Sequence, residues 1–196
     1  IVLIGAGGIG SMTALALAKT GFSNLIVFDP DKVETHNLPS QLYTAEQVGE
    51  NKVGALADTI EELTGTPLAR SIPEKWTGHV APVVISAVDS MLARSEIYSQ
   101  LKTEYGVALY IESRMGAETM RIYSGQPADP DFIRQYEKTL YPDSDASPEK
   151  CTSKAIAYNT MVIGGLIASL VKKYAVGVPY PLEIIFALKQ YQFMKL

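Results

Sequence analysis

Short apolar runs alternate with segments of helical composition along the first half of the chain. The strongest runs, which lack the polar alternation of a half-exposed strand, are residues 1–4, 24–28, 82–88 and 106–111. A weaker strand is predicted at residues 67–72. The helical segments between these strands are residues 11–19, 51–63 and 90–105. Buried strands that alternate with helices are typical of a doubly wound parallel sheet, so we predict an α/β, Rossmann-like fold.

The pattern changes in the second half of the chain. Residues 120–123 predict an antiparallel strand that is reached through a turn at Gly116. Residues 126–147 are rich in proline, aspartate and serine, with one short helix near residues 132–139. A last strand is predicted at residues 182–188. We therefore expect antiparallel strands to be added to the sheet in the C-terminal half.

A long helix is predicted after the single cysteine, Cys151. Thr152 or Ser153 is expected to cap its start, and the helix runs to Tyr174. The positions expected to be buried are Ile156, Val162, Ile163, Leu166, Ile167 and Leu170. Their spacing places them on a face that can pack against the rest of the fold.

A glycine-rich turn, residues 5–10, links the first strand to the first helix. Gly5 allows a tight bend after the strand, and Gly10 lets the helix pack close to the sheet. Gly7 and Gly8 let the backbone approach a phosphate, which the free amides of the first helical turn then face. A strand, a GxGxxG turn and a helix in this order predict a phosphate site, with a purely structural turn as the alternative.

Two acids, Asp29 and Asp31, follow the second predicted strand. Parallel strands present their carboxyl ends at the edge of the sheet where ligands bind. An acid about 20 residues beyond the glycine turn is well placed to hold a ribose hydroxyl pair, and we assign this role to Asp29. The alternative is that both acids are turn residues around Pro30.

Two further charged residues are predicted at the same edge. Lys52 falls in the first turn of a helix that Asn51 can cap, where a cation is unfavourable unless an anion lies nearby. A solvated surface lysine is the alternative. Asp89 follows the strand at residues 82–88, and it could either cap the next helix or hold a magnesium ion, for which a carboxylate is a suitable ligand.

Composition limits the classes of function. The 196 residues suffice for one sizeable domain. A formal net charge of −4 without a dense basic run argues against nucleic acid as a partner. The most apolar window, residues 161–171, is shorter than the roughly 20 residues of a membrane span. A single cysteine excludes an internal disulfide and suits a reducing cytoplasm. Because the chain begins inside a predicted strand, we expect further residues upstream.

With these motifs in this order, the sequence resembles the ThiF/MoeB family, the prokaryotic relatives of the ubiquitin-activating enzymes, over nearly its whole length. The matching segments are residues 5–10, residues 29–34 with Asn37, Leu38 and Gln41, residues 51–53, Asp89 with Arg94, and residues 151–152 with residues 163–166 and 172–173. The resemblance implies a single adenylation domain over residues 1–196.

The resemblance also implies an activity and partners. Such an enzyme binds ATP and magnesium and adenylates the C-terminal glycine of a small ubiquitin-like protein or peptide, with release of pyrophosphate. A cytoplasmic homodimer is expected from the family. Catalysis of this kind rests on positioning and charge neutralisation, which explains a lysine in the first turn of a helix.

The site residues are implied by the same similarity. Gly8 and its neighbours in the glycine turn line the phosphates, and Asp29 holds the ribose. Asn37 and Lys52 contact phosphate oxygens, and Asp89 binds the magnesium ion. The remaining nucleotide-binding positions that the resemblance implies are Asp31 and Gln41.

Cys151 has two interpretations. A single cysteine is most often a small buried hydrophobe. In members of the family that the sequence resembles, the matching cysteine forms a thioester or accepts sulfur after adenylation. The predicted helix that follows Cys151 would lower the pKa of its thiol and favour the nucleophilic thiolate.

The sequence departs from the family pattern at Ser40. The family's Asn-x-x-Arg-Gln motif is found at residues 37–41, with Ser40 in place of the arginine that would meet the terminal phosphate. The paired CxxC motifs that hold zinc in many relatives are missing, so no zinc is expected. The family's other arginine lies on a helix upstream of residue 1.

Two other functions remain open from the residues. The strand, the GxGxxG turn and the following acid serve NAD(P) equally well, which leaves an NAD(P)-dependent oxidoreductase as a rival. Lys52, Asp89 and Cys151 have no evident use in that chemistry. The second rival is a catalytically inactive nucleotide-binding subunit that pairs with an active one, which Ser40 favours.

Overall fold

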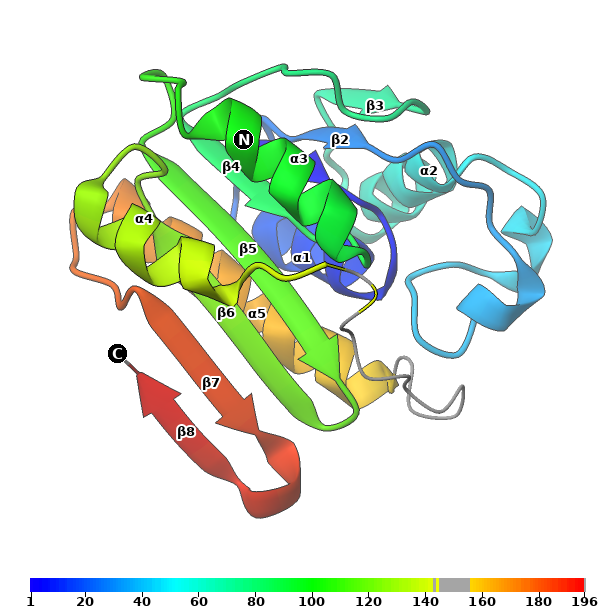
Figure 1. Ribbon diagram of the computed structural model, residues 1–196. Helices are drawn as coiled ribbons and strands as arrows, with labels where there is room; N and C mark the ends of the chain where they lie inside the picture. The colour runs from blue at the N-terminus through cyan, green and yellow to red at the C-terminus, as the bar shows by residue number, and fades with distance from the viewer. Residues whose placement is uncertain (143, 145–155, 196) are drawn as a thin grey trace.

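The fold is built on one eight-stranded sheet (Figure 1). The structure is a computed structural model, which describes residues 1–142, 144 and 156–195. The strand order is β3-β2-β1-β4-β5-β6-β7-β8. The order reverses at β1, because β2 and β3 lie on one side of it and β4 on the other. Open α/β sheets bind ligands at such a reversal, outside the carboxyl ends of the strands. The predicted Rossmann-like sheet, parallel first and antiparallel later, is confirmed.

The parallel strands end at one common edge. They are β1 (Val2–Ile4), β2 (Ile26–Phe28), β3 (Arg70–Ile72), β4 (Val83–Ser86) and β5 (Leu109–Gly116). Ile4 pairs with Phe28 on one side and with Ser86 on the other, and Ser86 pairs with Glu112. Only β5 continues past this line, to Gly116. The residues that follow β1, β2 and β4 therefore meet at the edge.

Antiparallel strands complete the sheet: β6 (Thr119–Gly125), β7 (Glu183–Ala187) and β8 (Gln192–Lys195). β6 pairs with β5 from Tyr110 to Gly116, which holds β5 in the sheet well beyond the predicted end at residue 111. The predicted turn follows Gly116, with Ala117 at a φ of 49°. β8 was not predicted, because its short apolar run has no clear alternation.

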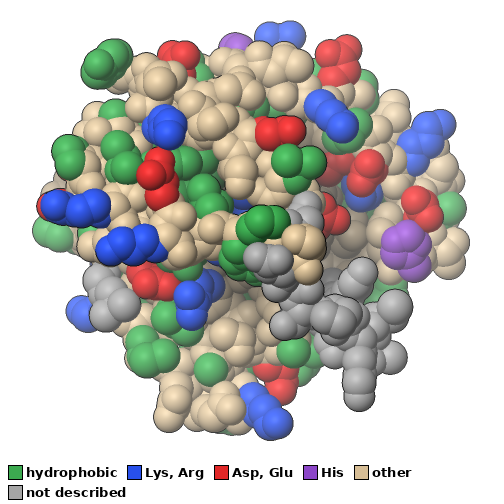
Figure 2. All heavy atoms as spheres, in the orientation of Figure 1, with side chains coloured by type: hydrophobic (Ala, Val, Ile, Leu, Met, Phe, Trp, Pro, Cys, Tyr) green, Lys and Arg blue, Asp and Glu red, His purple; other side chains and the backbone are tan. Residues whose placement is uncertain are grey.

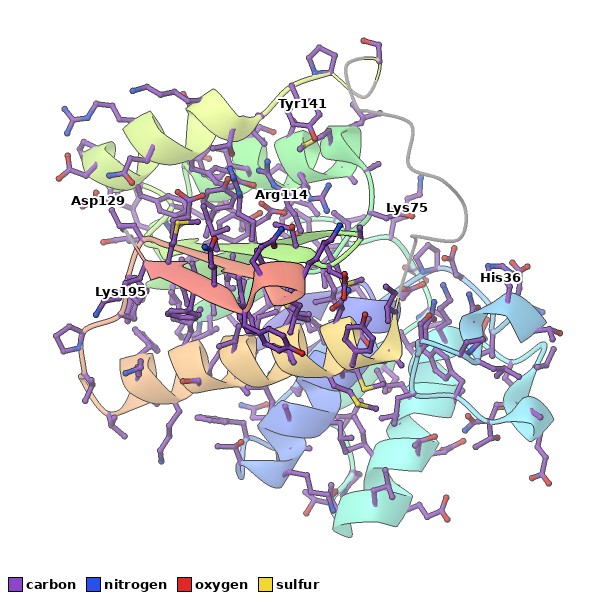
Figure 3. The ribbon with its side chains drawn as sticks, turned by 90° about the horizontal axis from the view of Figure 1, so that it is seen from below. His36, Lys75, Arg114, Asp129, Tyr141 and Lys195 are labelled. Carbon is purple, nitrogen blue, oxygen red and sulfur yellow. The ribbon has the colours of Figure 1, made fainter. Side chains whose placement is uncertain are left out.

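Helices cover the two faces of the sheet separately. Figure 3 views the sheet from its edge, with α1 (Gly8–Lys19), α2 (Lys52–Thr64) and α5 (Ala157–Ala175) below it. Above it lie α3 (Met91–Leu101) and α4 (Pro130–Tyr136), which the 3-10 turn η3 (Glu137–Thr139) extends. Alternate strand residues face opposite layers: Leu3 and Ile85 pack in the first core, and Val2 and Val84 in the second. Helix α3 ends at Leu101, earlier than the predicted residue 105.

Helix α5 packs tightly against α1. A Cβ placed on Gly164 would lie 2.8 Å from the backbone carbon of Met12, so glycine is needed for this close approach. The helix begins at Ala157 with Ile156 at its N-cap position, so the prediction that Thr152 or Ser153 caps it is wrong. Those two residues and Cys151 lie outside the described residues. Of the six positions predicted to be buried, Ile163, Ile167 and Leu170 are buried, whereas Ile156, Val162 and Leu166 are only half-buried.

The surface agrees with the modest net charge. On the face shown in Figure 2, which α3 and α4 cover, acidic and basic side chains are interspersed. Within the described ranges, none of the helices is both long enough and apolar enough to cross a bilayer.

Candidate functional site

The glycine turn bends from β1 into α1 at the carboxyl edge of the sheet. Gly5 has a φ of +98°, a conformation that favours glycine, and a Cβ there would lie 2.7 Å from the Ala87 carbonyl oxygen. A Cβ on Gly10 would lie 1.9 Å from the carbonyl oxygen of Gly5. The fold itself therefore requires glycine at both positions. A Cβ on Gly7 meets no described atom within 4 Å, so Gly7 borders open space at the start of α1.

Asp29 ties the end of β2 to the glycine turn. The backbone amide of Ala6 donates to Asp29 Oδ2 at 2.6 Å, and the amide of Asp31 donates to Oδ1 at 2.8 Å. The second bond is the Asx-type turn that was the alternative interpretation of the two acids. Each carboxylate oxygen has a second lone pair. The turn role therefore leaves acceptor capacity on both oxygens of Asp29.

Tyr43 supports the same turn from the loop after β2. Its hydroxyl donates to the Ala6 carbonyl oxygen at 2.6 Å. Burial raises the pKa of Tyr43, and the negative charges of Asp29 and Asp31 raise it further. The hydroxyl therefore stays protonated and remains a donor. Ala6 is thus held by Asp29 through its amide and by Tyr43 through its carbonyl, which fixes the turn's geometry.

Lys52 forms an ion pair at this edge. Its Nζ lies 2.9 Å from Asp31 Oδ2, and its backbone amide donates to the Asp31 carbonyl oxygen at 2.9 Å. The Lys52 side chain is 9% exposed, whereas that of Asp31 is 64% exposed. The alternative of a solvated surface lysine is therefore wrong. Asp31 supplies the anion that a lysine in the first turn of α2 needs, and Asn51 occupies the N-cap position without a side-chain cap bond.

Asn37 and Gln41 lie in the loop after β2, which contains the 3-10 turns η1 (Thr35–Asn37) and η2 (Ala45–Gln47). Asn37 is buried, and its Oδ1 accepts a bond from the Glu34 amide at 2.8 Å. This hydrogen bond caps the start of η1. Gln41 Oε1 is buried and finds no hydrogen-bond partner among the described residues. Gln41 therefore offers an acceptor that a ligand's donor could satisfy.

Ser40 is buried beside the glycine turn. Its carbonyl oxygen accepts a bond from Thr160 Oγ1 of α5 at 3.1 Å. A Cβ on Gly8 would lie 2.9 Å from Thr160 Cγ2 and 3.4 Å from the Ser40 carbonyl oxygen. The packing of α5 against the turn therefore requires glycine at position 8. Helix α5 and the Ser40 backbone close one side of the turn.

Asp89 is exposed just beyond the end of β4. Helix α3 is capped by Ser90, whose Oγ accepts from the Ala93 amide at 3.2 Å, so the interpretation of Asp89 as the cap is wrong. No group of three or more His, Cys, Asp or Glu side chains that could hold a metal occurs in the described part of the chain. A magnesium ion is commonly bound through one or two carboxylates together with phosphates and water, so a lone Asp89 fits that metal.

A buried ionic network adjoins Asp89, and the residue pattern did not predict it. Arg94 of α3 donates to the Val88 carbonyl oxygen at 2.6 Å and to Glu112 Oε1 at 2.6 Å. Arg114 donates to the other oxygen, Glu112 Oε2, at 2.7 Å. Glu112 is fully buried on β5, so its charge depends on these two arginines. Arg94, which is part of the family resemblance, thus positions the segment that carries Asp89.

A glycine turn at the switch point of a Rossmann-like sheet, with an acid at the end of the next strand, is typical of nucleotide-binding α/β domains. The chain belongs to the ThiF family, whose sequence profile matches residues 1–196. A segment of 60 residues is 43% identical to ubiquitin-like modifier-activating enzyme 5 of Drosophila simulans and to that of Aedes aegypti. This segment covers 31% of the chain and 15% of each relative.

Solved structures share the fold over the whole chain. PaaA superimposes with a TM-score of 0.73 at 23% identity, covering 100% of this chain and 62% of PaaA. Escherichia coli MccB gives a TM-score of 0.76 at 19% identity, covering 100% of this chain and 61% of MccB. At these identities the likeness shows the fold alone. The chain spans less than two thirds of each of these proteins.

Proposed function

We propose that this chain is the adenylation domain of an enzyme that activates the C-terminal carboxyl group of a ubiquitin-like protein or peptide with ATP and magnesium. The observation that carries the proposal is the buried Lys52 ammonium held beside Asp31 at the carboxyl edge. An ammonium has three donors, and Asp31 occupies one of them. A buried cation at the same edge of the sheet as a glycine turn suits a triphosphate better than it suits a nicotinamide ring.

The relatives support the same activity. Ubiquitin-like modifier-activating enzyme 5 acts on a ubiquitin-like modifier, as its name states. MccB has been solved with ATP and, separately, with AMPCPP and MccA. The proposed partner is therefore a protein or peptide with a free C-terminal carboxyl group, and a second copy of the chain is the proposed dimer partner.

The residues would divide the work as follows. The Gly7 and Gly8 amides and the start of α1 bind phosphate oxygens, and Asp29 accepts bonds from the ribose hydroxyls. A carboxylate oxygen of the substrate attacks the α-phosphorus, the bond to the bridging oxygen of the β-phosphate breaks, and pyrophosphate leaves. Lys52 neutralises the charge that repels the attacking carboxylate. A magnesium ion at Asp89 would supply further charge neutralisation.

Ser40 and Cys151 refine this proposal. Ser40 cannot supply the arginine charge of the family motif, so Lys52 carries more of the neutralisation here. Cys151, which lies outside the described residues, is proposed to receive the activated acyl group as a thioester after adenylation. That step exchanges the acyl–phosphate bond for an acyl–sulfur bond, and AMP leaves.

The experiment uses two pools of synthetic octapeptides with random sequences that end in glycine. One pool has a free C-terminal carboxyl group and the other a C-terminal amide. We expect the protein with ATP and magnesium to form a peptidyl adenylate and pyrophosphate with the free-acid pool and not with the amide pool. Equal product from both pools would contradict carboxyl activation. ATP binding without product from either pool would favour the inactive nucleotide-binding subunit.

A further inference from the structure

A basic pocket of about 420 Å³ opens on the α4 side of the sheet, at the projecting end of the β5–β6 hairpin. Its charged lining residues are Arg114 of β5, Arg121 of β6 and Lys138 of η3. Thr139 and Tyr141 complete the side nearest α4. Figure 3 shows Arg114 and Tyr141 on the same side of the sheet. The pocket uses none of the glycine-turn residues.

The charges around this pocket do not cancel. Arg114 shares the buried Glu112 carboxylate with Arg94, so these three residues together carry one positive charge. Arg121 lies 3.5 Å from Glu183, and its side chain is 46% exposed. Lys138 adds a further positive charge, and none of the lining residues in the described part of the chain is an acid. The pocket therefore attracts an anion.

Three hydrogen bonds fix the position of the Arg114 guanidinium before any anion binds. Its Nε donates to Glu112 Oε2 at 2.7 Å, its Nη1 to the Thr139 carbonyl oxygen at 2.8 Å and its Nη2 to Thr139 Oγ1 at 2.9 Å. Its guanidinium carbon lies 4.8 Å from the centre of the Tyr123 ring. A guanidinium has five N–H donors, so two remain after these bonds. Because the side chain is already ordered, little conformational entropy is lost on binding.

The pocket lies near the proposed reaction centre, on the β5–β6 side of it. Across the sheet, Ile4 of β1 pairs with Ser86 of β4, which pairs with Glu112 of β5. Gly5 follows Ile4 directly, and Arg114 lies two positions beyond Glu112. Neighbouring strands are about 4.8 Å apart, so the Arg114 backbone lies on the order of 10 Å from Gly5. That distance corresponds to about three residues of extended peptide. Asp29, Asp31 and Lys52 lie on the β1–β2 side, which leaves the β5–β6 side to the acyl substrate.

We propose that this pocket binds a side-chain carboxylate of the substrate, from an aspartate or glutamate about three residues before the activated carboxyl group. The inference rests on the proposed function, because it assigns the pocket to the substrate of that reaction. Arg114 forms the fixed wall, and Arg121 and Lys138 are specificity-determining residues. The site selects acidic peptides over neutral ones of the same shape.

The test compares two sets of alanine-rich heptapeptides that end in Gly-Gly. One set carries a glutamate at the third, fourth or fifth residue from the C-terminus, and the other carries glutamine there. Calorimetry with ATP and excess EDTA, in which the magnesium-dependent reaction does not proceed, measures their affinity. We expect the best glutamate peptide to bind about tenfold more tightly than its glutamine counterpart, as a charge-assisted contact allows. Equal affinity of the two sets would overturn the proposal.

Variants locate the effect in the pocket. Arg121→Gln and Lys138→Gln alter exposed side chains, so the fold is expected to persist, and the double variant should lose the preference for glutamate. Arg70→Gln is the matched control, because Arg70 is an exposed arginine on β3, several strands away from the pocket. If the double variant keeps the preference, or if Arg70→Gln loses it, the pocket is not the site.

Nucleotide binding by the same samples separates this inference from the proposed function. Failure of the wild-type protein to bind ATP with magnesium would overturn the proposed function. Normal ATP binding without a glutamate preference would overturn only the acidic subsite. If the double variant weakens ATP or inorganic phosphate instead of the peptide, the pocket binds phosphate and the assignment to the substrate is wrong.

Discussion

The Nζ of Lys52 lies 2.9 Å from Oδ2 of Asp31, and the lysine is the buried member of the pair. The two side chains differ sharply in exposure, 9% against 64%. Asp31 is therefore the solvent-facing member of the pair, and Lys52 is enclosed by the protein. The ammonium is thus held in a fixed position by its countercharge, and two of its three N–H donors are left for other acceptors.

Asp31→Asn should destabilise the protein without unfolding it. Removing one partner leaves a buried lysine without its countercharge, which costs about 1–3 kcal/mol. Urea unfolding monitored by circular dichroism measures the change, and Asp58→Asn, an exposed carboxylate on α2, is the control. An Asp31→Asn protein as stable as the wild type would mean that the pair contributes nothing to the fold.

Asp29→Ala should weaken ATP binding. The variant loses the acceptor proposed for the ribose hydroxyls and the bond from the Ala6 amide that holds the glycine turn. Loss of charge-assisted bonds of this kind corresponds to about tenfold or more in affinity. Calorimetry with ATP and magnesium measures it. Unchanged affinity would leave Asp29 with its turn role alone.

Gly7→Ala and Gly10→Ala should fail in different ways. A Cβ on Gly10 meets the Gly5 carbonyl oxygen at 1.9 Å, so Gly10→Ala should be severely destabilised. A Cβ on Gly7 meets no described atom within 4 Å, and Gly7 has a φ of −72° that alanine adopts readily. Gly7→Ala should therefore keep the wild-type melting temperature and lose ATP affinity, because the methyl group occupies the space proposed for a phosphate.

A matched control for Gly7→Ala is available in α5. Gly165 also has open space around its Cβ position among the described atoms, and it is exposed on the face of α5 that is turned away from α1. Gly165→Ala should retain ATP affinity and gain slightly in stability from better helix propensity. If Gly7→Ala binds ATP as well as Gly165→Ala does, the phosphates do not approach the turn as proposed.

Asp89→Asn should remove the dependence of the reaction on magnesium. The side chain is exposed and Ser90 caps α3, so the fold and the melting temperature should not change. Pyrophosphate release with the free-acid peptide pool should fall to the level seen for the wild type in excess EDTA. A variant whose rate still rises with magnesium as the wild-type rate does would show that the ion binds elsewhere.

The elements that the sequence predicts correctly are those set by local pattern. The first strand, the glycine turn and α1 follow one another directly, and each is coded by its own residues. The later strand β8 and the long extension of β5 depend on pairing between segments far apart in the chain. Apolar periodicity carries no information on such pairing, so both were missed.

In the site, too, the sequence predicts the residues that local pattern places and not the contacts that depend on packing between distant segments. Asp29 and the glycines were placed correctly at the carboxyl edge, because strand ends fix them. The pairing of Lys52 with Asp31 and the sharing of Glu112 by two arginines were not foreseen. Glu112 sits within a strand, and only the arrival of α3 over β5 brings Arg94 to it. A glutamate that follows directly on an apolar strand is the one local signal of a buried carboxylate with a partner cation.

The central claim is that this edge binds ATP through Lys52, and thermal unfolding tests it most directly. Melting temperatures of the wild type, Lys52→Ala and the control Lys172→Ala are compared with ATP and magnesium, with NAD and with NADP. ATP at about 100 times its dissociation constant should stabilise the wild type by about 2.7 kcal/mol, which corresponds to a shift of about 5–10 °C. Lys172→Ala should keep that shift and Lys52→Ala should lose it. A shift with NAD or NADP instead of ATP, or an undiminished ATP shift in Lys52→Ala, would contradict the claim.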